Sequence, residues 1–599
     1  MKKPINHNQY LIQSAYDFFN NGDIVSADKI LDNYDISYSS DFDADFYNLK
    51  SIIYFRNKEF NNSLKFIDLA INLTPNCVIF YINKANVLRE LGQLVESLKN
   101  YDIALKYDPN NIRIYFNKAL LFIDLNNFIE AKTLLECAIS IEPNFSQAYN
   151  SLGYIYSTFL EKYNESILFF SEAIKINPYY FDAQSNLAEA LRKVERYEDA
   201  IKICESVITI KIDYSKIYNV LANIYVDLFL YEDAIFYYLK AISFDKKFYE
   251  AHYNLSIAYK ECNLLVDSLA SLDNAIKIKP NYFLALFSKS VLYFLLGDFI
   301  NAWIYYEYRF KIKSDKYPKY LLTSKPQWNG VNLINCLYVW GEQGVGDQIM
   351  YGTVLQDLGF LNSKIFISLD KRLVNIFSNS FPKYIFIDKN NLPPNIEFDA
   401  HISLGTLAGI LRPDINSFPL SSHYVKASEP NKFYSLFNKN KFKCGISWQS
   451  NNIHLKKYKN LNLNDFLPIL EIPNIQFINL QHRINDDFDY FINNLNCDFL
   501  NIDGVDLFND FDSLVNIIYH CDLIITASNS LAHLAAAMGK KVFVITSFSK
   551  GSFWYWREFN GKNVWYPNVR VFSQSKPNDW STPFSEIKSI LEIDSNQIK

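Results

Sequence analysis

The segment GEQGVGDQIMY, residues 341–351, combines three glycines with one aspartate directly after a short apolar run. Gly341, Gly344 and Gly346 permit a tight turn and a close approach of the backbone to a ligand. Asp347 then opens a predicted helix, where a carboxylate is either a plain partner of the helix dipole or a general base that accepts a proton from an attacking hydroxyl. No Lys-Ser or Lys-Thr pair follows the glycines, so the turn is not a P-loop.

A second segment with chemical potential is DLIITASNSLAHLAAAMGKK, which we expect to run from a strand into a helix. Ser528, Asn529 and Ser530 can cap this helix, and His533 lies one turn further along on the face of Ser530. Backbone N–H groups and the dipole at such a helix start can hold a diphosphate without a metal. The alternative interpretation is an ordinary cap followed by a structural histidine.

Both turns follow short apolar runs of the kind that form buried parallel strands. Beyond residue 335, runs of four to six apolar and β-branched residues alternate with segments of helix length. This pattern is typical of parallel sheets covered by helices on both faces, and ligands of such sheets bind outside the carboxyl ends of the strands. The runs are residues 336–340, 364–369, 384–387, 444–448, 475–480, 522–527 and 541–546.

The N-terminal half of the chain repeats with a period of 34 residues. Prolines at Pro75, Pro109, Pro143, Pro178 and Pro280 are separated by 34, 34, 35 and three times 34 residues. We expect the one extra residue to be absorbed in the turn near Glu161. Small residues suit the place where two helices cross closely, and twelve residues before each proline or its equivalent stand Ser63, Ser97, Ala131, Ser166, Ala200, Ala234 and Ser268. Paired antiparallel helices from about residue 45 to 281 are therefore predicted, and they resemble tetratricopeptide repeats.

These patterns divide the chain into five predicted parts. We expect an atypical helical cap at residues 1–44, a solenoid at 45–313, a linker at 314–335, and two Rossmann-like halves at 336–440 and 441–599. The first half is short, which suggests that the solenoid completes it. Solenoids present a concave groove, in which we expect a protein partner.

Taken together, residues 285–590 resemble the heptosyltransferases, in the version found fused behind tetratricopeptide repeats in bacterial proteins. The resemblance rests on an ordered set of pieces: YEYR, EQGVGD, GISWQSN followed by a basic segment and KNLNL, INLQ, DLFNDFDSLVNII, SNSLAHLAAAMGK, WYWRE, WYP and DW. It implies a GT-B fold and an inverting, metal-independent transfer of sugar from a nucleotide diphosphate. The layout is also similar to that of the O-linked N-acetylglucosamine transferases, which adds protein to the possible acceptors.

The resemblance implies roles for single positions. The catalytic candidates are Asp347, as base, and His533, at the donor phosphate, while Lys459 would meet the leaving diphosphate. The other implied donor-binding residues are Gly344, Gly346, Trp448, Gln449, Gln481, Ser528, Asn529 and Ser530. Two positions depart from the family, which usually has Asp at Ser528 and Gly at Ala536. The first change removes a carboxylate from the implied donor site.

Composition narrows the possible functions. A formal net charge of −5 over 599 residues creates no positive field that would recruit nucleic acid. No run approaches the ~20 apolar residues that span a bilayer, and the first residues lack the pattern of a secretory signal. The eight cysteines stand singly, which indicates neither a disulfide framework nor a zinc site. We therefore expect a cytoplasmic protein without a metal or a cofactor, with a nucleotide sugar as substrate.

Two classes of function remain open at this point. The first is a glycosyltransferase acting on a protein or glycan acceptor that the solenoid recruits. The second is a non-catalytic scaffold whose repeats bind a partner and whose transferase domain is degenerate. The aromatic residues Trp554, Trp556, Trp565 and Tyr566 either stack on a ligand or close a core.

Overall fold

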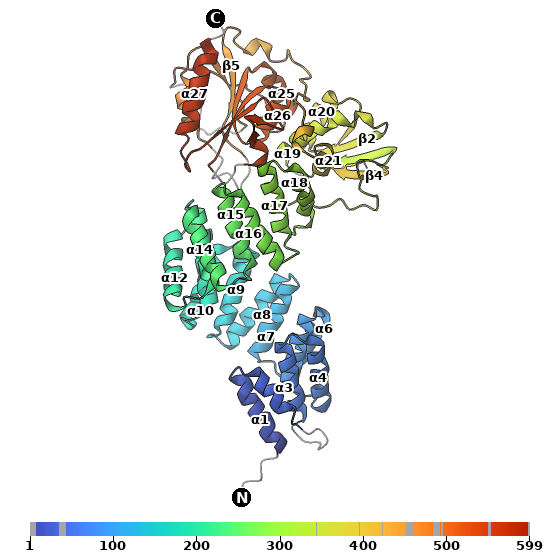
Figure 1. Ribbon diagram of the computed structural model, residues 1–599, viewed down its shortest axis with the longest axis vertical. Coiled ribbons are helices and arrows are strands. Elements are labelled where there is room, and N and C mark those ends of the chain that lie inside the picture. The colour runs from blue at the N-terminus through green and yellow to red at the C-terminus, as the bar shows by residue number, and fades with distance from the viewer. Residues whose placement is uncertain are drawn as a thin grey trace. The chain divides into compact units, whose positions relative to one another are not determined.

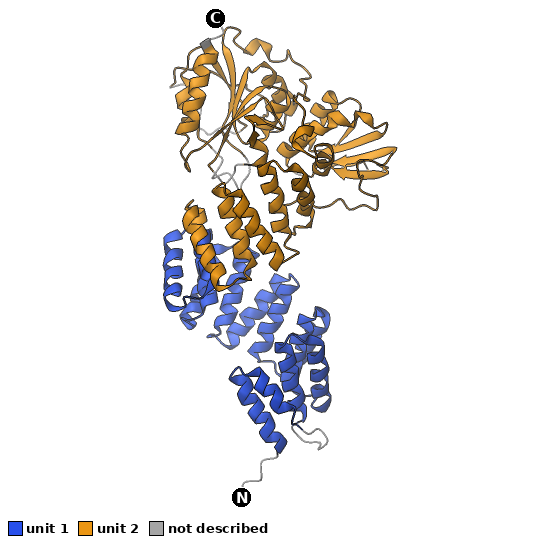
Figure 2. Cartoon of the chain, viewed as in Figure 1, with its two compact units in different colours: residues 1–224 blue, residues 225–599 orange. Residues whose placement is uncertain are grey.

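The computed structural model describes residues 7–34, 43–342, 344–393, 396–421, 423–450, 461–482, 492, 495–548 and 553–596. It forms two compact units, residues 1–224 and residues 225–599 (Figure 2). The division falls within helix α13 (Ser215–Asp227).

The first unit consists of consecutive antiparallel helix pairs (Figure 1). The small residues predicted at the helix crossings are fully buried, and the Ser63 hydroxyl donates a hydrogen bond of 2.8 Å to the carbonyl oxygen of Ser51 on the paired helix. The helices are α1 (His7–Asn20), α2 (Ile24–Leu31), α3 (Asp43–Arg56), α4 (Phe60–Leu73), α5 (Val78–Glu90), α6 (Leu94–Tyr107), α7 (Ile112–Asp124), α8 (Phe128–Ile141), α9 (Ser146–Thr158), α10 (Tyr163–Ile176), α11 (Phe181–Lys193) and α12 (Tyr197–Ile210).

The turn between α9 and α10 contains the extra residue that the proline spacing predicts. Four residues separate these helices, whereas three separate α7 from α8. Glu161 in this turn has a φ of 52°, in the left-handed region that lets the chain reverse tightly. The prediction is confirmed, and the helix packing on either side keeps its phase.

The second unit begins with further helices of the same kind. They are α14 (Tyr231–Phe244), α15 (Tyr249–Glu261), α16 (Leu265–Ile278), α17 (Phe283–Leu296) and α18 (Phe299–Tyr306), followed by the 3-10 helix η1 (Glu307–Lys311). Gly297, with a φ of 79°, ends α17 in the left-handed conformation that favours glycine. The helical array therefore continues directly up to the predicted linker.

The first sheet has the strand order β3-β2-β1-β4, with all neighbouring strands parallel. Its strands are β1 (Cys336–Trp340), β2 (Lys364–Leu369), β3 (Ile385–Asp388) and β4 (Ala400–Ser403). Helices α19 (Val345–Tyr351), α20 (Lys371–Ser380) and α21 (Leu404–Leu411) follow β1, β2 and β4, and the 3-10 helix η2 (Gly352–Phe360) extends α19. Three strands were predicted within one residue of their bounds, and β4 was missed.

The second sheet has the order β12-β9-β8-β5-β6-β7 and is also parallel throughout. Side chains alternate between its faces, because Ile524 and Val542 enter one core while Leu523 and Phe543 enter the other. Helices α25 (Phe511–His520) and α26 (Ser530–Ala537) cover one face and α27 (Ser581–Asn596) covers the other (Figure 1). The strands are β5 (Phe442–Ser447), β6 (Ile475–Asn479), β7 (Asp498–Leu500), β8 (Leu523–Ala527), β9 (Lys541–Thr546) and β12 (Val569–Ser573).

The last helix pair shares a hydrophobic core with the first sheet. Phe294 of α17 and Trp303 of α18 are buried in the same cluster as Leu337 and Val339 of β1. The indole Nε1 of Trp303 donates a 2.7 Å hydrogen bond to the carbonyl oxygen of Arg412, at the end of α21. The pair α17–α18 thus completes the domain of the first sheet, in agreement with the shortness of that half in the sequence.

Candidate functional site

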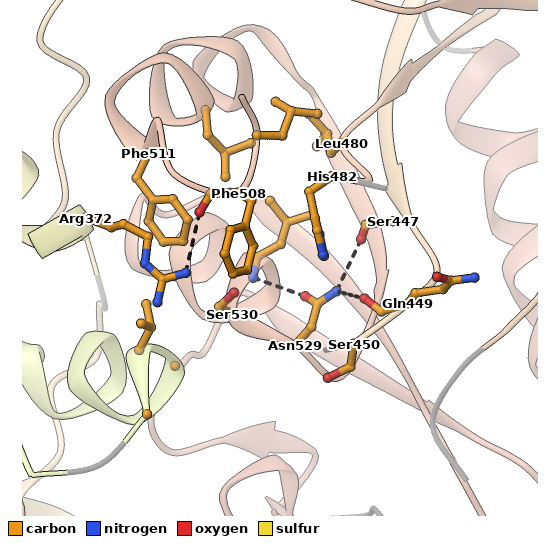
Figure 3. Close-up of a pocket in the computed structure, with 16 residues that line it drawn as sticks. Arg372, Ser447, Gln449, Ser450, Leu480, His482, Phe508, Phe511, Asn529 and Ser530 are labelled. Atoms are coloured by element: carbon orange, nitrogen blue, oxygen red, sulfur yellow. Dashed lines mark hydrogen bonds between the residues drawn. The ribbon is translucent and has the colours of Figure 1, made fainter. Parts of the chain in front are cut away.

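The described residues of the second unit enclose a cleft of about 390 Å³ whose walls come from both sheets (Figure 3). Five of the segments that line it follow a strand: Gly344 to Gly346 follow β1, Arg372 follows β2, Gln449 and Ser450 follow β5, Leu480 and His482 follow β6, and Asn529 to Leu531 follow β8. A further lining segment, Leu507 to Leu514, leads into α25. The carboxyl ends of parallel strands are where open sheets bind ligands. This intersheet cleft is therefore the candidate site.

Within the second sheet, the cleft lies where the strand order reverses. The chain runs from β5 outward through β6 to β7 and then returns to β8 on the other side of β5. Asn529 joins the two strand ends, because its Nδ2 donates to Ser447 Oγ at 3.2 Å and to the Gln449 carbonyl at 3.1 Å. Its Oδ1 caps α26 by accepting the N–H groups of Leu531 and Ala532 at 3.0 and 3.2 Å. Two of the helix's first N–H groups are thus already paired.

Gln481 fixes the loop after β5 from behind the cleft. Its Oε1 accepts hydrogen bonds from Ser447 Oγ at 2.9 Å and from the backbone N–H groups of Trp448 and Gln449 at 3.1 and 2.9 Å. These three donors determine the orientation of the amide. Its side chain is buried, and within the described part of the chain its Nε2 has no hydrogen-bond partner.

Ser528 and His533 do not line the cleft themselves, although each borders a residue that does. Both are 3% exposed. Ser528 Oγ accepts a 2.9 Å hydrogen bond from the indole Nε1 of Trp556. The His533 ring stacks on Trp556 with 4.7 Å between centroids, and its Nδ1 lies 3.2 Å from the Tyr566 hydroxyl. Trp556 and Tyr566, with the buried Trp565, belong to the hydrophobic core, as the core interpretation of this aromatic cluster predicts.

The glycine turn and α26 are in direct contact. A Cβ atom added to Gly346 would lie 2.9 Å from Cδ2 of His533, so only glycine fits there without movement. Asp347 is half-buried in the first turn of α19, and its Oδ2 would lie 3.5 Å from a Cβ on Gly344, which lines the cleft. The two turns singled out in the sequence thus meet at one place.

The charge of Asp347 acts on three buried tyrosines, Tyr351, Tyr555 and Tyr566. Burial raises the pKa of Tyr555 and Tyr566 well above the usual range, and the charge of Asp347 raises both further. Burial, then the neighbouring Tyr306 and then the charge of Asp347 raise the pKa of Tyr351 as well, and its hydroxyl lies 2.8 Å from that of Tyr306. These tyrosines therefore stay protonated at neutral pH.

The structure brings together most of the residues predicted from the sequence. Lys459 lies outside the described residues. Gly344, Gly346, Gln449, Asn529 and Ser530 line the cleft, whereas Asp347, Trp448, Gln481, Ser528 and His533 lie next to it or behind those residues. Their roles in binding or catalysis stay predictions.

Sequence reasoning missed the cleft residues contributed by other segments. Arg372 forms a bidentate ion pair with Asp370, with hydrogen bonds of 2.8 and 3.1 Å to its two carboxylate oxygens. The guanidinium lies 5.0 and 5.4 Å from the ring centres of Phe508 and Phe511 (Figure 3). His482 was missed beside the predicted Gln481. The available signal was position, because both residues closely follow strands that were predicted.

Comparisons with known proteins concern the helical part. Residues 85–126 match a family model described as TPR repeat, and residues 112–145, 146–180 and 215–248 match one described as Tetratricopeptide repeat. The solenoid is built of tetratricopeptide repeats. Such repeats make this part of the chain a protein-interaction module.

The chain is also similar to individual proteins. Protein FlbA from Caulobacter vibrioides is 24% identical over 324 residues, and the chain spans about half the length of this curated relative, 53% of it. A tetratricopeptide repeat protein from Parabacteroides merdae is 20% identical, with a TM-score of 0.36, over 42% of this chain and 98% of that one. Yeast Tom70 is 14% identical, with a TM-score of 0.38, over 51% and 78%.

Neither a membrane-spanning helix nor a metal-binding group is found among the described residues. No helix among them is long and apolar enough to cross a membrane. Within the same residues, no group of three or more His, Cys, Asp or Glu side chains is placed to hold a metal ion.

Proposed function

We propose that the chain is a GT-B glycosyltransferase that moves a sugar from a nucleotide diphosphate to a protein or glycan acceptor recruited by its tetratricopeptide repeats. One observation carries the proposal: the intersheet cleft is lined by the carboxyl ends of strands from two parallel sheets, with the glycine turn on one wall and the capped start of α26 on the other. This is the place where a nucleotide-binding fold holds its ligand.

The proposed reaction is an inverting substitution at the sugar carbon, without a metal. Asp347 accepts the proton of the acceptor hydroxyl while the oxygen of that hydroxyl attacks the sugar carbon. The bond from that carbon to the diphosphate oxygen breaks, and the nucleoside diphosphate leaves. The backbone at Gly344 and Gly346 and the side chains of Gln449 and Ser530 line the space available to the donor.

Three residues in this proposal fix the walls of the cleft. Gln481 and Asn529 fix the ends of β5 and β8, and His533 supports the glycine turn through its contact with Gly346. Gln481 and His533 do not line the cleft, so their effect on donor binding is indirect, whereas Asn529 also lines it. The related family usually has aspartate where this chain has Ser528. In this chain the Ser528 hydroxyl accepts the hydrogen bond of the Trp556 indole, and we assign it no contact with the sugar donor.

The test is release of nucleoside diphosphate from a panel of nucleotide sugars, with and without cell extract as a source of acceptor. Asp347→Asn should lower turnover by about a hundredfold or more, since a general base contributes that much to a rate. Asp388→Asn is the matched control, because Asp388 ends β3 of the same sheet and lies outside the cleft. Equal activity in the two variants would remove Asp347 from the mechanism.

A scaffold function is the second candidate, and one observation favours it. The Leu531 and Ala532 N–H groups at the start of α26 are already bonded to Asn529, which suits a purely structural cap. In this case nucleotide sugars bind and none is turned over, whichever protein extract is added. Binding measured by calorimetry together with absent product would decide for the scaffold.

A further inference from the structure

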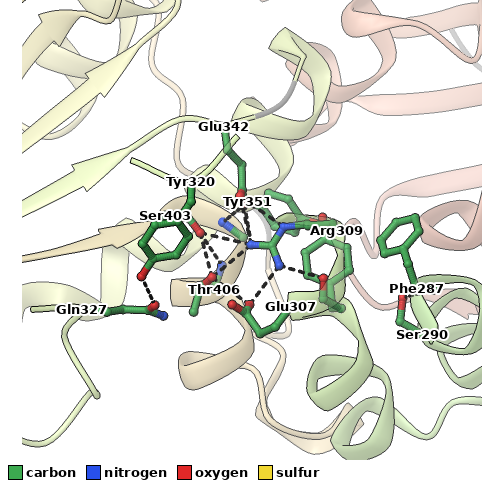
Figure 4. A network of polar contacts seen from close by, with 12 residues as sticks. Phe287, Ser290, Glu307, Arg309, Tyr320, Gln327, Glu342, Tyr351, Ser403 and Thr406 are labelled. Atoms are coloured by element: carbon green, nitrogen blue, oxygen red, sulfur yellow. Dashed lines mark hydrogen bonds and ion pairs between the residues drawn. The ribbon is translucent and has the colours of Figure 1, made fainter. Parts of the chain in front are cut away.

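The first sheet has its own reversal of strand order, and a side chain from the end of the repeats fills the crevice there. The chain leaves β1 toward β2 and β3 and returns to β4 on the other side of β1. In an open parallel sheet this crevice is a ligand position. Here Arg309 of η1 occupies it and is fully buried (Figure 4).

Arg309 has a protein partner at each of its guanidinium nitrogens. Nε and Nη2 donate to the carboxylate of Glu342, just after β1, at 2.9 to 3.1 Å. The planar group lies between the rings of Tyr306 and Phe310, each 4.1 Å away at the centroid. The guanidinium also donates bonds of 2.9 to 3.1 Å to the Tyr306 carbonyl, Glu307 Oε1, Ser403 Oγ and Thr406 Oγ1.

The Glu342 carboxylate is held equally firmly. Its side chain is 1% exposed, and its Oε1 also accepts the N–H group of Gly405 at 2.9 Å. A Cβ atom at Gly405 would lie 2.2 Å from the same oxygen, so the packing leaves it no alternative position on that side. Burial opposes the charge of Arg309, but the carboxylates of Glu342 and Glu307 outweigh it and raise the pKa of this group.

We propose that Arg309 is a positioning residue for the intersheet cleft. It holds Glu342, and Glu342 opens the turn whose Gly344 and Gly346 line the cleft and whose Asp347 is the proposed base. The end of the repeats thereby sets the path of this turn. The inference rests on the proposed function for its effect on turnover, while its effect on the turn is independent of any reaction.

The experiment compares two double variants of the full chain. Arg309→Gln with Glu342→Gln removes both charges together, so no unpaired charge stays buried, and the new amide oxygen still accepts the Gly405 N–H. Lys289→Gln with Asp273→Asn is the matched control. These residues form an ion pair of 2.6 Å between the buried Lys289 of α17 and Asp273 of α16, and neither belongs to the turn.

We expect amides of residues 344–351 to exchange hydrogen at least about tenfold faster in the Arg309 variant than in the control. Nucleoside diphosphate release should fall by at least about tenfold, because small displacements of reacting groups lower rates strongly. The thermal midpoints of the two variants should be similar. If the Arg309 double variant does not fold, the single variant Arg309→Lys replaces it. Lysine keeps the charge but loses the paired hydrogen bonds to Glu342, so we expect a weaker increase in amide exchange and a weaker decrease in nucleoside diphosphate release.

Turn amides that exchange as slowly as in the control, or turnover equal to that of the control, would overturn the positioning role. If the unaltered chain releases no nucleoside diphosphate from any donor, the proposed function fails. The exchange measurement then decides the role of Arg309 by itself.

Discussion

Gly346 lies where the turn after β1 contacts α26 of the second sheet. Its Cα faces the imidazole of His533, and that ring is fixed from the far side by Trp556 and Tyr566. These contacts oppose a displacement of the ring. The residue therefore serves close packing here, and its φ does not lie in the left-handed region.

Gly346→Ala should destabilise the protein by about 1 to 3 kcal/mol, the usual cost of adding a methyl group to a packed interior. Gly359→Ala is the matched control, because nothing lies within 4 Å of a Cβ at that exposed glycine of η2, and it should change stability by less than about 0.5 kcal/mol. Urea unfolding followed by far-UV circular dichroism measures both. An equal midpoint for the two alanine variants would contradict the contact.

Helix α18 shows how a repeat helix becomes part of another domain. Its buried face carries Phe299 and Trp303 into the core of the first sheet, while Ile300 and Ile304 on its opposite face are 60% and 61% exposed. Burial of Phe299 and Trp303, rather than a polar outer face, therefore marks the side of α18 that packs on the sheet domain. The indole bond to the Arg412 carbonyl fixes its rotation.

Trp303→Ala should cost about 3 to 5 kcal/mol, the range for removing a large aromatic side chain from a core. Ile304→Ala, in the same helix, should cost less than about 1 kcal/mol, because the isoleucine is largely in solvent. The free energies of unfolding from denaturant titration give the difference. Similar losses in both variants would show that α18 does not pack as described.

Much of the element plan could be predicted from local patterns. The period of 34 residues predicted the helix pairs and even the turn near Glu161, and the apolar runs predicted β1, β2 and β9 to the residue. Strands β4, β7 and β12, with four, three and five residues, gave no clear run and were missed. Such short strands are defined by their neighbours in the sheet more than by their own residues.

The polar partners in and around the site could not be predicted in the same way. Arg309 and Glu342 are 33 residues apart, and Ser528 and Trp556 are 28 apart. Neither pair produces a repeating pattern in the sequence, because each contact depends on how separate helices and strands pack together. The sequence therefore indicated which turns would form the cleft, while the packing decided which side chains face it and which support it.

At the scale of the whole molecule, the second unit joins the last repeats and both sheets. A fragment of residues 249–599 keeps the pairs α15–α16 and α17–α18, whereas a fragment of residues 314–599 has only the sheet domains. The shorter fragment loses four large core side chains, Phe294, Phe299, Trp303 and Tyr306. At about 2 kcal/mol each, their loss is comparable with the entire stability of a domain, which is about 5 to 15 kcal/mol.

We therefore expect fragment 249–599 to unfold in one cooperative step and to be monomeric by light scattering, with a slow-exchanging turn at residues 344–351. Fragment 314–599 should aggregate or bind a hydrophobic dye, because its exposed core face has no cover and Glu342 has lost Arg309. Gel filtration and dye fluorescence of the two fragments measure this directly. A monomeric 314–599 with an unchanged midpoint would place the domain boundary at the linker and make the last repeat pair dispensable for the cleft.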